Sequence, residues 1–171
     1  YTREWYEMKY NRIKEILPEC SVSCDIITGF CSETEEEHAD TLDLLRKCEY
    51  EFSYMYFYSE RPGTLAARKY EDDVPEEVKK RRLTEVIEIQ HEIAKKRNAA
   101  QVGELHTVLI EMQSKKNENE WMGRNSQNIK VIFPKGNHKM GDYVDVKIER
   151  STTTSLIGVA VSWEHASVAC S

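Results

Sequence analysis

Cys20, Cys24 and Cys31 lie close together near the start of the chain and carry the most reactive side chains in it. Thiolates of neighbouring cysteines hold iron–sulfur clusters, so this group raises the question of such a site. Cys24 lies at the start of a predicted strand, which points successive side chains to opposite faces and disfavours a cluster here. The odd total of five cysteines and their irregular spacing also argue against a disulfide framework. We therefore expect free thiols in a reducing cytoplasm, with a cluster as the less favoured alternative.

Two further groups of residues could bind a ligand. Gly29, Phe30 and Glu33 follow one apolar run, and Arg61 follows another. Glycine lets a ligand approach the backbone closely, an aromatic ring can pack on it, and a guanidinium can hold a carboxylate through two hydrogen bonds. Glu33 could instead stabilise the start of a helix, and Arg61 could instead pair with Glu60. The two groups would form one site only if their apolar runs are neighbouring parallel strands.

A strand–helix–strand unit, Cys24 to Tyr58, would bring these groups together. Ile26–Ile27 opens a nearly continuous apolar run, which is typical of a strand buried on both faces of a parallel sheet. Ser32 can then cap a helix, with Glu35 reaching back in a capping box. The second strand is predicted at Phe52–Tyr58. The carboxyl ends of parallel strands lie at one edge, so both loops are expected there.

Helices flank this unit on both sides in the sequence. The first residues read as an amphipathic helix that ends near Pro18. A longer helix is predicted to start at Pro75 and to end after the basic residues Lys95–Arg97, with apolar residues at helical spacing along one face. Four consecutive cations, Lys79–Arg82, point in different directions on a helix. We expect most of them on the solvated surface, with RNA contact as the alternative.

After Gly103 the pattern changes to short strands separated by turn signals. The predicted strands are Thr107–Glu111, Lys130–Phe133, Tyr143–Ile148 and Leu156–Val161. Gln113–Asn128 joins the first two as a long polar loop or hairpin. Together they predict a small antiparallel β-barrel with a filled interior. The fold class is thus an α/β part, residues 1–100, followed by an all-β barrel, residues 101–162. Residues 163–171 show no periodicity and are expected to be disordered or foreign to the native protein.

The polar segment between the first two barrel strands combines residue types that contact RNA. Lys115, Lys116 and Arg124 can contact phosphates, Trp121 can stack on an unpaired base, and the amide of Asn128 can read a base edge. The alternative is that the indole covers one end of the barrel and the cations are solvated. These five residues are the predicted RNA-binding set.

Charge is distributed unevenly along the 171 residues. Residues 1–100 carry 16 Lys and Arg against 22 Asp and Glu, and residues 101–171 carry 8 against 8, so the net charge of −6 belongs to the first part. No apolar run is long enough to span a bilayer, and no charged-then-apolar leader precedes Tyr1. His38 is expected on an exposed helix turn, and the five histidines form no metal-binding pattern. These features indicate a cytoplasmic protein without a metal site or membrane partner.

Five strings of the chain resemble, in order and spacing, the radical-SAM methylthiotransferases: DIITGFCSETEEE, YSERPGT, PEEVKKRRLTEVIEIQ, SKKNENEWMGRNSQN and GDYVDVKI. The resemblance runs from about Tyr1 to about Val161 and favours the branch that acts on isopentenyladenosine in tRNA. It implies that residues 1–100 are the C-terminal part of a radical-SAM α/β barrel with a long linking helix. It also implies that residues 101–162 are a TRAM domain, an RNA-binding barrel similar to an OB fold.

The family's chemistry is implied by the same resemblance. Its members use S-adenosylmethionine and two 4Fe–4S clusters to add a methylthio group to carbon 2 of isopentenyladenosine next to the anticodon. The partner is therefore the anticodon stem-loop of tRNA, and no DNA is expected. Gly29, Phe30, Glu33 and Arg61 would lie at the S-adenosylmethionine site.

The cluster ligands of the family follow the pattern C-x3-C-x2-C. Cys20 and Cys24 fit the first interval, but Ile27 stands at the third position. The ligands are thus expected in upstream sequence, and this fragment is expected to hold no cofactor, no metal and no catalytic residue, and to be inactive alone. Members usually carry Pro-Gly where this chain has Cys31-Ser32. Two alternatives stay open: an RNA-binding or interaction module without an enzymatic parent, or a methylthiotransferase for another tRNA adenosine or a ribosomal protein.

Overall fold

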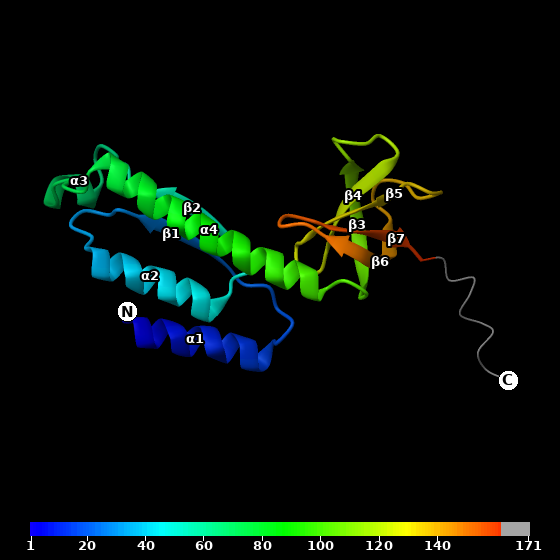
Figure 1. Ribbon diagram of the computed structural model, residues 1–171, viewed down its shortest axis with the longest axis horizontal. Coiled ribbons are helices and arrows are strands. Elements are labelled where there is room, and N and C mark those ends of the chain that lie inside the picture. The colour runs from blue at the N-terminus through cyan, green and yellow to red at the C-terminus, as the bar shows by residue number, and fades with distance from the viewer. Residues whose placement is uncertain (162–171) are drawn as a thin grey trace. The chain divides into compact units, whose positions relative to one another are not determined.

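The computed structural model describes residues 1–161, which divide into two units, the first Tyr1–Ala94 and the second beginning at Lys95 (Figure 1). The helices and strands, in chain order, are α1 (Arg3–Ile16), β1 (Ser23–Thr28), α2 (Glu35–Cys48), β2 (Phe52–Phe57), α3 (Leu65–Lys69), α4 (Glu76–Ala100), β3 (Leu105–Gln113), β4 (Glu120–Asn125), β5 (Lys130–Pro134), β6 (Tyr143–Ser151) and β7 (Leu156–Ala160). The boundary between the units falls within α4. The predicted tail, 163–171, lies outside the described residues.

β1 and β2 form a two-stranded parallel sheet with α2 as the crossover between them. The register runs from Ser23 opposite Phe52 to Thr28 opposite Phe57. The predicted strand–helix–strand unit is therefore present. Side chains from α1, α2 and α4 pack on one face of this sheet, and the buried members of the cluster are Tyr10, Leu45, Cys48, Tyr50, Val86, Ile89 and Ile93. Burial of each such side chain contributes about 1.5–3 kcal/mol, so this cluster is what holds the unit together.

The other face of the sheet is exposed, and the prediction of a strand buried on both faces is wrong. Ile27 is 58% exposed, and Tyr54 and Tyr56 of β2 are 52% and 55% exposed. The reason is geometric: the helices of this unit that pack on the sheet do so on one side, and alternate side chains of a strand point to opposite faces. The exposed face carries Ile27 and the exposed aromatic residues of β2, together with the polar Ser23 and Asp25 of β1.

α2 begins two residues later than the sequence indicated. The cap is Thr34, whose hydroxyl accepts from the backbone N–H of Glu37 at 3.2 Å, while the Glu37 carboxylate accepts from the Thr34 N–H at 2.8 Å. The predicted box of Ser32 and Glu35 is therefore wrong. Ser32 has φ +63°, a left-handed conformation, whereas an N-cap residue has an extended backbone.

α4 buries two of the four cations that were expected on its surface. Lys79 and Arg82 are 4% and 3% exposed, so for these two the expectation is wrong. Positions 79, 82, 86, 89 and 93 recur at spacings of three and four, which places both cations on the same face as the buried Val86 and Ile93. Buried charges need partners of opposite charge. Lys79 forms an ion pair with Asp72, and Arg82 forms one with Glu33.

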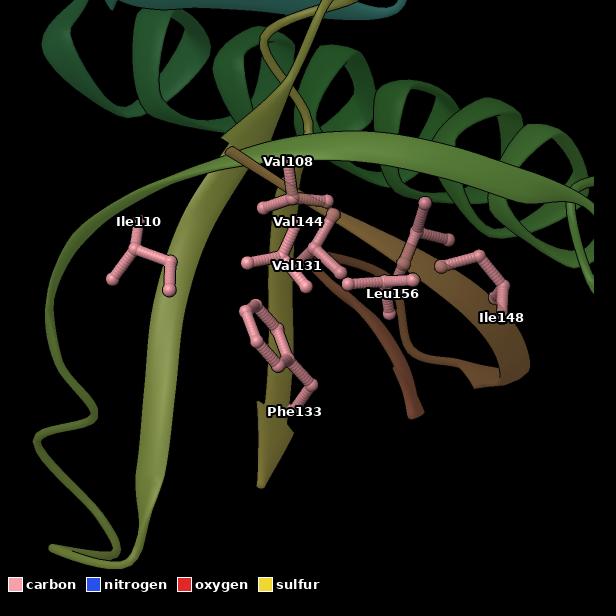
Figure 2. Packing of buried hydrophobic residues seen from close by; sticks show 8 residues of the cluster. Val108, Ile110, Val131, Phe133, Val144, Ile148 and Leu156 are labelled. Atoms are coloured by element: carbon pink, nitrogen blue, oxygen red, sulfur yellow. The ribbon is translucent and has the colours of Figure 1, made fainter. Parts of the chain in front are cut away.

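The second unit contains a closed barrel in the order β3-β4-β5-β7-β6, completed by antiparallel pairing of β6 with β3. β5 and β7 pair in parallel, so the prediction of an antiparallel barrel is wrong for this pair. The reason is geometric: a closed ring of five strands cannot be antiparallel at every pair. Its strands bury alternate side chains, as predicted. The interior is filled by Val108, Ile110, Val131, Phe133, Val144, Val146, Ile148 and Leu156 (Figure 2). Closure leaves this small sheet without a free edge.

β4 was predicted only as part of a polar loop or hairpin, and the hairpin alternative is the correct one. Two of its inward residues, Gly123 and Asn125, are not apolar side chains, which explains why no strand pattern is visible. A Cβ at Gly123 would lie 2.2 Å from the carbonyl oxygen of Leu109, so the strands can approach only with glycine there.

Among residues 1–161, no helix combines the length and apolar character needed to cross a membrane.

Candidate functional site

The loops that follow β1 and β2 lie side by side, as the parallel pairing requires. The ring of Phe30, after β1, packs edge-on against the ring of Tyr58, after β2, with centroids 4.9 Å apart. The Tyr58 N–H donates to the carbonyl of Thr28 at 2.8 Å and extends the pairing by one residue. Phe30 remains 40% exposed. An aromatic surface therefore lies at the edge where a ligand of a parallel sheet is expected.

Gly29 is fixed by its packing on α4. Its φ is +67°, and a Cβ would lie 2.4 Å from Cγ of Lys79. Its N–H donates to Oε2 of Glu33 at 2.9 Å. Any other residue would be strained at this φ and would also displace Lys79. The glycine that was predicted to admit a ligand is thus required first by the fold of the loop.

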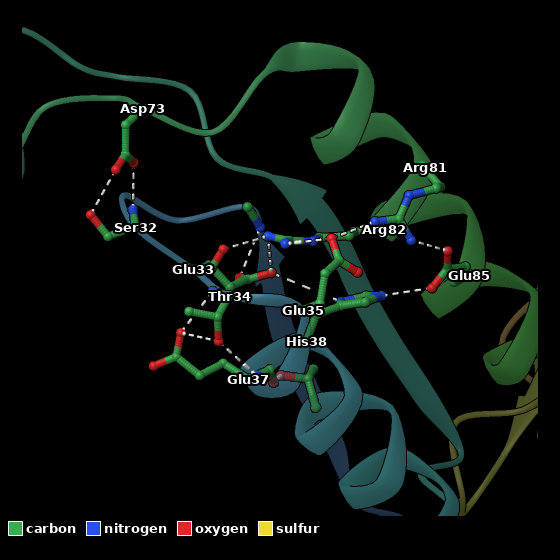
Figure 3. A network of polar contacts seen from close by, with 12 residues as sticks. Ser32, Glu33, Thr34, Glu35, Glu37, His38, Asp73, Arg81, Arg82 and Glu85 are labelled. Carbon is green, nitrogen blue, oxygen red and sulfur yellow. Dashed lines mark hydrogen bonds and ion pairs between the residues drawn. The ribbon is translucent and has the colours of Figure 1, made fainter.

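Glu33 is held in an ion-pair network with α4 (Figure 3). Nη1 of Arg82 donates to Oε1 of Glu33 at 2.9 Å and to its carbonyl at 3.0 Å. Nη2 of Arg82 donates to Glu35 at 2.8 Å. Each carboxylate oxygen of Glu33 therefore already accepts a hydrogen bond, one from Gly29 and one from Arg82. The geometry gives Glu33 a role in positioning the loop, which differs from both the ligand contact and the helix-start role considered from the sequence.

The same network includes a histidine that was predicted to be exposed. His38 is only 2% exposed, and its Nε2 lies 2.8 Å from Oε2 of Glu85, so that prediction is wrong. The reason is that its turn of α2 faces α4. Hydrogen bonds from Arg81 and Arg82 lower the pKa of Glu35 below its usual value.

The Cys31-Ser32 pair lies in a second tether of this loop. The Ser32 N–H donates to the carboxylate of Asp73 at 2.6 Å, and its hydroxyl donates to the same carboxylate at 2.9 Å. The backbone bond first, and the hydroxyl bond second, lower the pKa of Asp73. These bonds hold Ser32 in a left-handed conformation that costs a non-glycine residue about 1 kcal/mol or more. Two contacts far apart in sequence thus fix the loop, one at Ser32 and one at Glu33.

Arg61 is exposed on the loop after β2. Its carbonyl accepts from the backbone and side chain of Thr64, but within residues 1–161 its guanidinium has no hydrogen-bond or ion-pair partner. The alternative partner Glu60 does not engage it. A carboxylate ligand would find this guanidinium available.

The cysteines do not converge on one point. Sγ of Cys24 lies 3.4 Å from the hydroxyl of Ser53, and Sγ of Cys20 donates to the carbonyl of Ser21 at 3.4 Å. Burial raises the pKa of Cys24, which disfavours the thiolate that a metal needs. Within the described part of the chain, no three His, Cys, Asp or Glu side chains are grouped to hold a metal ion. The cysteines in the described part of the chain do not fit an iron–sulfur cluster.

In the barrel, Lys115 and Lys116 are exposed between β3 and β4, and neither has a partner within residues 1–161. Trp121 differs from them because it packs against the core. Its Nε1 donates to the carbonyl of His138 at 3.1 Å, and Nζ of Lys135 lies 4.7 Å from the ring centroid. This placement matches the alternative in which the indole covers the barrel.

The structure joins Arg124 and Asn128 at the turn between β4 and β5. Nη1 of Arg124 donates to the carbonyl of Asn128 at 2.9 Å and to its side-chain oxygen at 3.2 Å. Asn128 has φ +63°, which asparagine tolerates better than most residues. Nε of Arg124 lies 3.3 Å from Glu111. The turn therefore fixes one edge of the guanidinium, and Nη2 has no partner in the described range.

Arg82 is the residue at this site that the sequence did not single out. The signal was its spacing of four and eleven residues from Val86 and Ile93, which places it on the apolar face of the helix. A cation on a buried face is expected to be paired with an acidic group. Because Lys79–Arg82 are four consecutive cations, the sequence favoured a solvated position for all of them over burial of Arg82.

Residues 99–161 match the sequence profile of the TRAM domain. The barrel is a TRAM domain. The TRAM domain therefore begins at the end of α4 and includes all five barrel strands.

Over most of its length the chain is similar to bacterial proteins named tRNA-2-methylthio-N(6)-dimethylallyladenosine synthase. The relative from Amoebophilus asiaticus is 54% identical over 159 residues, which cover 92% of this chain and 33% of the relative. The relative from Christiangramia forsetii is 49% identical over 92% of the chain and 33% of its own length. The relative from Phocaeicola vulgatus is 46% identical over 94% of the chain and 35% of its own length. The chain thus spans about a third of the length of these synthases, and its TRAM domain lies within the shared region.

Proposed function

We propose that the chain is the C-terminal third of a cytoplasmic enzyme that adds a methylthio group to carbon 2 of isopentenyladenosine, also called dimethylallyladenosine, in tRNA. The observation that carries this proposal is the identity of 46–54% to proteins named for that reaction, over more than nine-tenths of this chain. The fold is consistent with it, because a parallel strand–helix–strand unit precedes an RNA-binding type of barrel.

The first unit is proposed to be a portion of a radical-SAM barrel. α1, α2 and α4 pack on one face of the sheet, and the opposite face is exposed, with aromatic side chains along β2. Such an arrangement fits two neighbouring strands of a larger (β/α) barrel, in which helices lie outside and the other face lines the interior. The exposed Ile27, Tyr54 and Tyr56 would then face the barrel interior.

S-adenosylmethionine is proposed to bind at the edge formed by the loops after β1 and β2. When bound, it supplies radical and methyl-transfer chemistry. Phe30 offers a ring that can pack on the adenosyl group, and Arg61 offers an unpaired guanidinium for the carboxylate. Gly29 and Glu33 contribute through loop position, because their polar groups bond to each other and to Arg82. The two 4Fe–4S clusters would be held by thiolates of other parts of the longer protein.

The TRAM domain is proposed to bind the anticodon stem-loop of tRNA. Lys115, Lys116 and Arg124 would contact phosphates, since the lysines are unpaired in the described structure and Nη2 of Arg124 is free there. Asn128 would act by fixing the position of the Arg124 guanidinium. Trp121 would contact RNA through the part of its ring that Lys135 does not cover.

Mass spectrometry of tRNA nucleosides tests the whole-protein activity. A strain that lacks the gene should contain isopentenyladenosine without the methylthio group, and the gene restored in trans should bring that group back. Unchanged methylthiolation in the deletion strain would contradict the proposal. Loss of a methylthio group from a different adenosine, with isopentenyladenosine unaffected, would assign another substrate to the same family.

A further inference from the structure

The outward surface of the TRAM barrel carries a row of four side chains across four strands. Both neighbours of Leu109 along β3 belong to the core, so Leu109 itself points outward. The register places Tyr143 of β6 opposite Leu109 on one side and Arg124 of β4 opposite it on the other. Lys130 of β5 lies opposite Arg124. The strand pairing therefore orders these residues as Tyr143, Leu109, Arg124 and Lys130.

This row combines an open aromatic ring with available cations. Tyr143 is 73% exposed, and among residues 1–161 its hydroxyl has no hydrogen-bond partner and its ring has no stacking or cation partner. Lys130 likewise has no partner within residues 1–161, and two donors on Nη2 of Arg124 are unused. Since neighbouring strands are roughly 4.8 Å apart, Tyr143 lies about 10 Å from Arg124 and about 14 Å from Lys130 along the row. An aromatic platform beside cations at this spacing suits one base and the phosphates that follow it.

The acidic groups near the row are already engaged. Glu111 pairs with Nε of Arg124 at 3.3 Å and so orients the guanidinium. Asp145, the next outward residue of β6 after Tyr143, accepts from the Thr107 hydroxyl at 2.6 Å. The segment 113–140, which contains β4 and β5, carries six Lys and Arg against two Glu. The surroundings of the row are therefore complementary to a polyanion.

We propose that this row binds single-stranded RNA, with an unpaired base stacked on Tyr143 and the adjoining phosphates on Arg124 and Lys130. The proposal rests on the RNA-binding function proposed for the TRAM domain and names the residue that contacts a base. Trp121 is less suited to that role because Lys135 lies over its ring and its Nε1 is bonded to the backbone.

The test measures equilibrium binding of the 171-residue chain to two RNAs, a hairpin with an unpaired loop and a fully paired duplex. Tyr143→Ala should weaken binding to the hairpin by about 5- to 150-fold and to the duplex by less than about twofold. Tyr143→Phe keeps the ring and should stay within roughly twofold of wild type on both RNAs. Leu105→Ala removes another exposed apolar side chain from the outward face of β3 and is the matched control, with no change expected.

Each other outcome overturns a stated part of the account. Hairpin binding that is unaffected by Tyr143→Ala would remove Tyr143 from the RNA surface while leaving the proposed RNA binding intact. Loss in Tyr143→Phe as well would replace stacking by a hydroxyl hydrogen bond and overturn the proposal. Equal losses on hairpin and duplex would do the same, because stacking on an unpaired base cannot act on a duplex. If wild type binds neither RNA, the RNA-binding function itself fails.

Discussion

Replacement of Arg82 by alanine is the perturbation that most directly probes how the loop after β1 is held. The side chain is 3% exposed and donates three hydrogen bonds, two to Glu33 and one to Glu35. Removing one partner of a buried ion pair costs about 3–5 kcal/mol, because the other charge stays buried. The Glu33 side chain is 14% exposed and so stays largely buried, whereas the Glu35 side chain is 63% exposed and is screened by water. We therefore expect the lower end, about 3 kcal/mol of unfolding free energy.

Urea denaturation followed by far-ultraviolet circular dichroism measures this loss, since α1, α2, α3 and most of α4 lie in the first unit. Arg81→Ala is the matched control on the same helix: Arg81 also pairs with Glu35, but its side chain is 46% exposed. It should lose much less stability than Arg82→Ala. Adding Glu33→Gln to Arg82→Ala should recover part of the loss, because the buried carboxylate is then gone. Equal denaturation midpoints for the Arg81 and Arg82 variants would refute the reasoning.

Three further perturbations test the loop and the barrel. Ser32→Gly removes the left-handed strain but keeps the N–H bond to Asp73. It should therefore raise the melting temperature of the first unit, by the equivalent of up to about 1 kcal/mol. A lower melting temperature would show that the lost hydroxyl bond to Asp73 outweighs the strain. Hydrogen bonds lower the folded-state pKa values of Glu35 and Asp73, so their stabilisation is complete above the unfolded values of 4.5 and 3.8 and is lost as the pH falls below them. Acid titration of the Glu35→Gln, Asp73→Asn double variant should therefore show a shallower loss of stability than wild type, and identical profiles would contradict this. Gly123→Ala would force a Cβ to within 2.2 Å of a carbonyl of β3, so it should disrupt the barrel, seen as loss of amide-exchange protection in β3 and β4; retained protection would count against the packing argument.

The elements whose residues follow a clear periodicity could be predicted from the sequence. Val144, Val146 and Ile148 alternate with polar residues, and the structure buries them together in the barrel. The strand–helix–strand unit followed from apolar runs and a helix signal of ordinary length. β4 could not be recognised as a strand, because two of its inward positions are held by Gly123 and the polar Asn125 and its outward residues include the apolar Met122, so polar and apolar residues do not alternate.

Long-range pairing explains what the sequence left undecided at the candidate site. Parallel strand ends predicted that Phe30 and the loop after β2 would lie together, and they do. The partner of Glu33 is Arg82, 49 positions away, and that of Ser32 is Asp73, 41 positions away. Local pattern cannot show such contacts. They decide which residue caps α2, which cations are buried and which groups bond to the Glu33 carboxylate.

A hybrid synthase provides the most direct test of the central claim, that this chain is the equivalent third of a tRNA methylthiotransferase. In the Amoebophilus asiaticus relative, the matching region would be replaced by this chain, and the hybrid would be expressed in a bacterial strain that lacks its own synthase. The readout is the ratio of methylthiolated to unmodified isopentenyladenosine in tRNA, measured by nucleoside mass spectrometry. We predict that the hybrid restores the methylthiolated nucleoside. Soluble, full-length hybrid that leaves only isopentenyladenosine, under conditions where the unaltered relative restores the modification, would contradict the account.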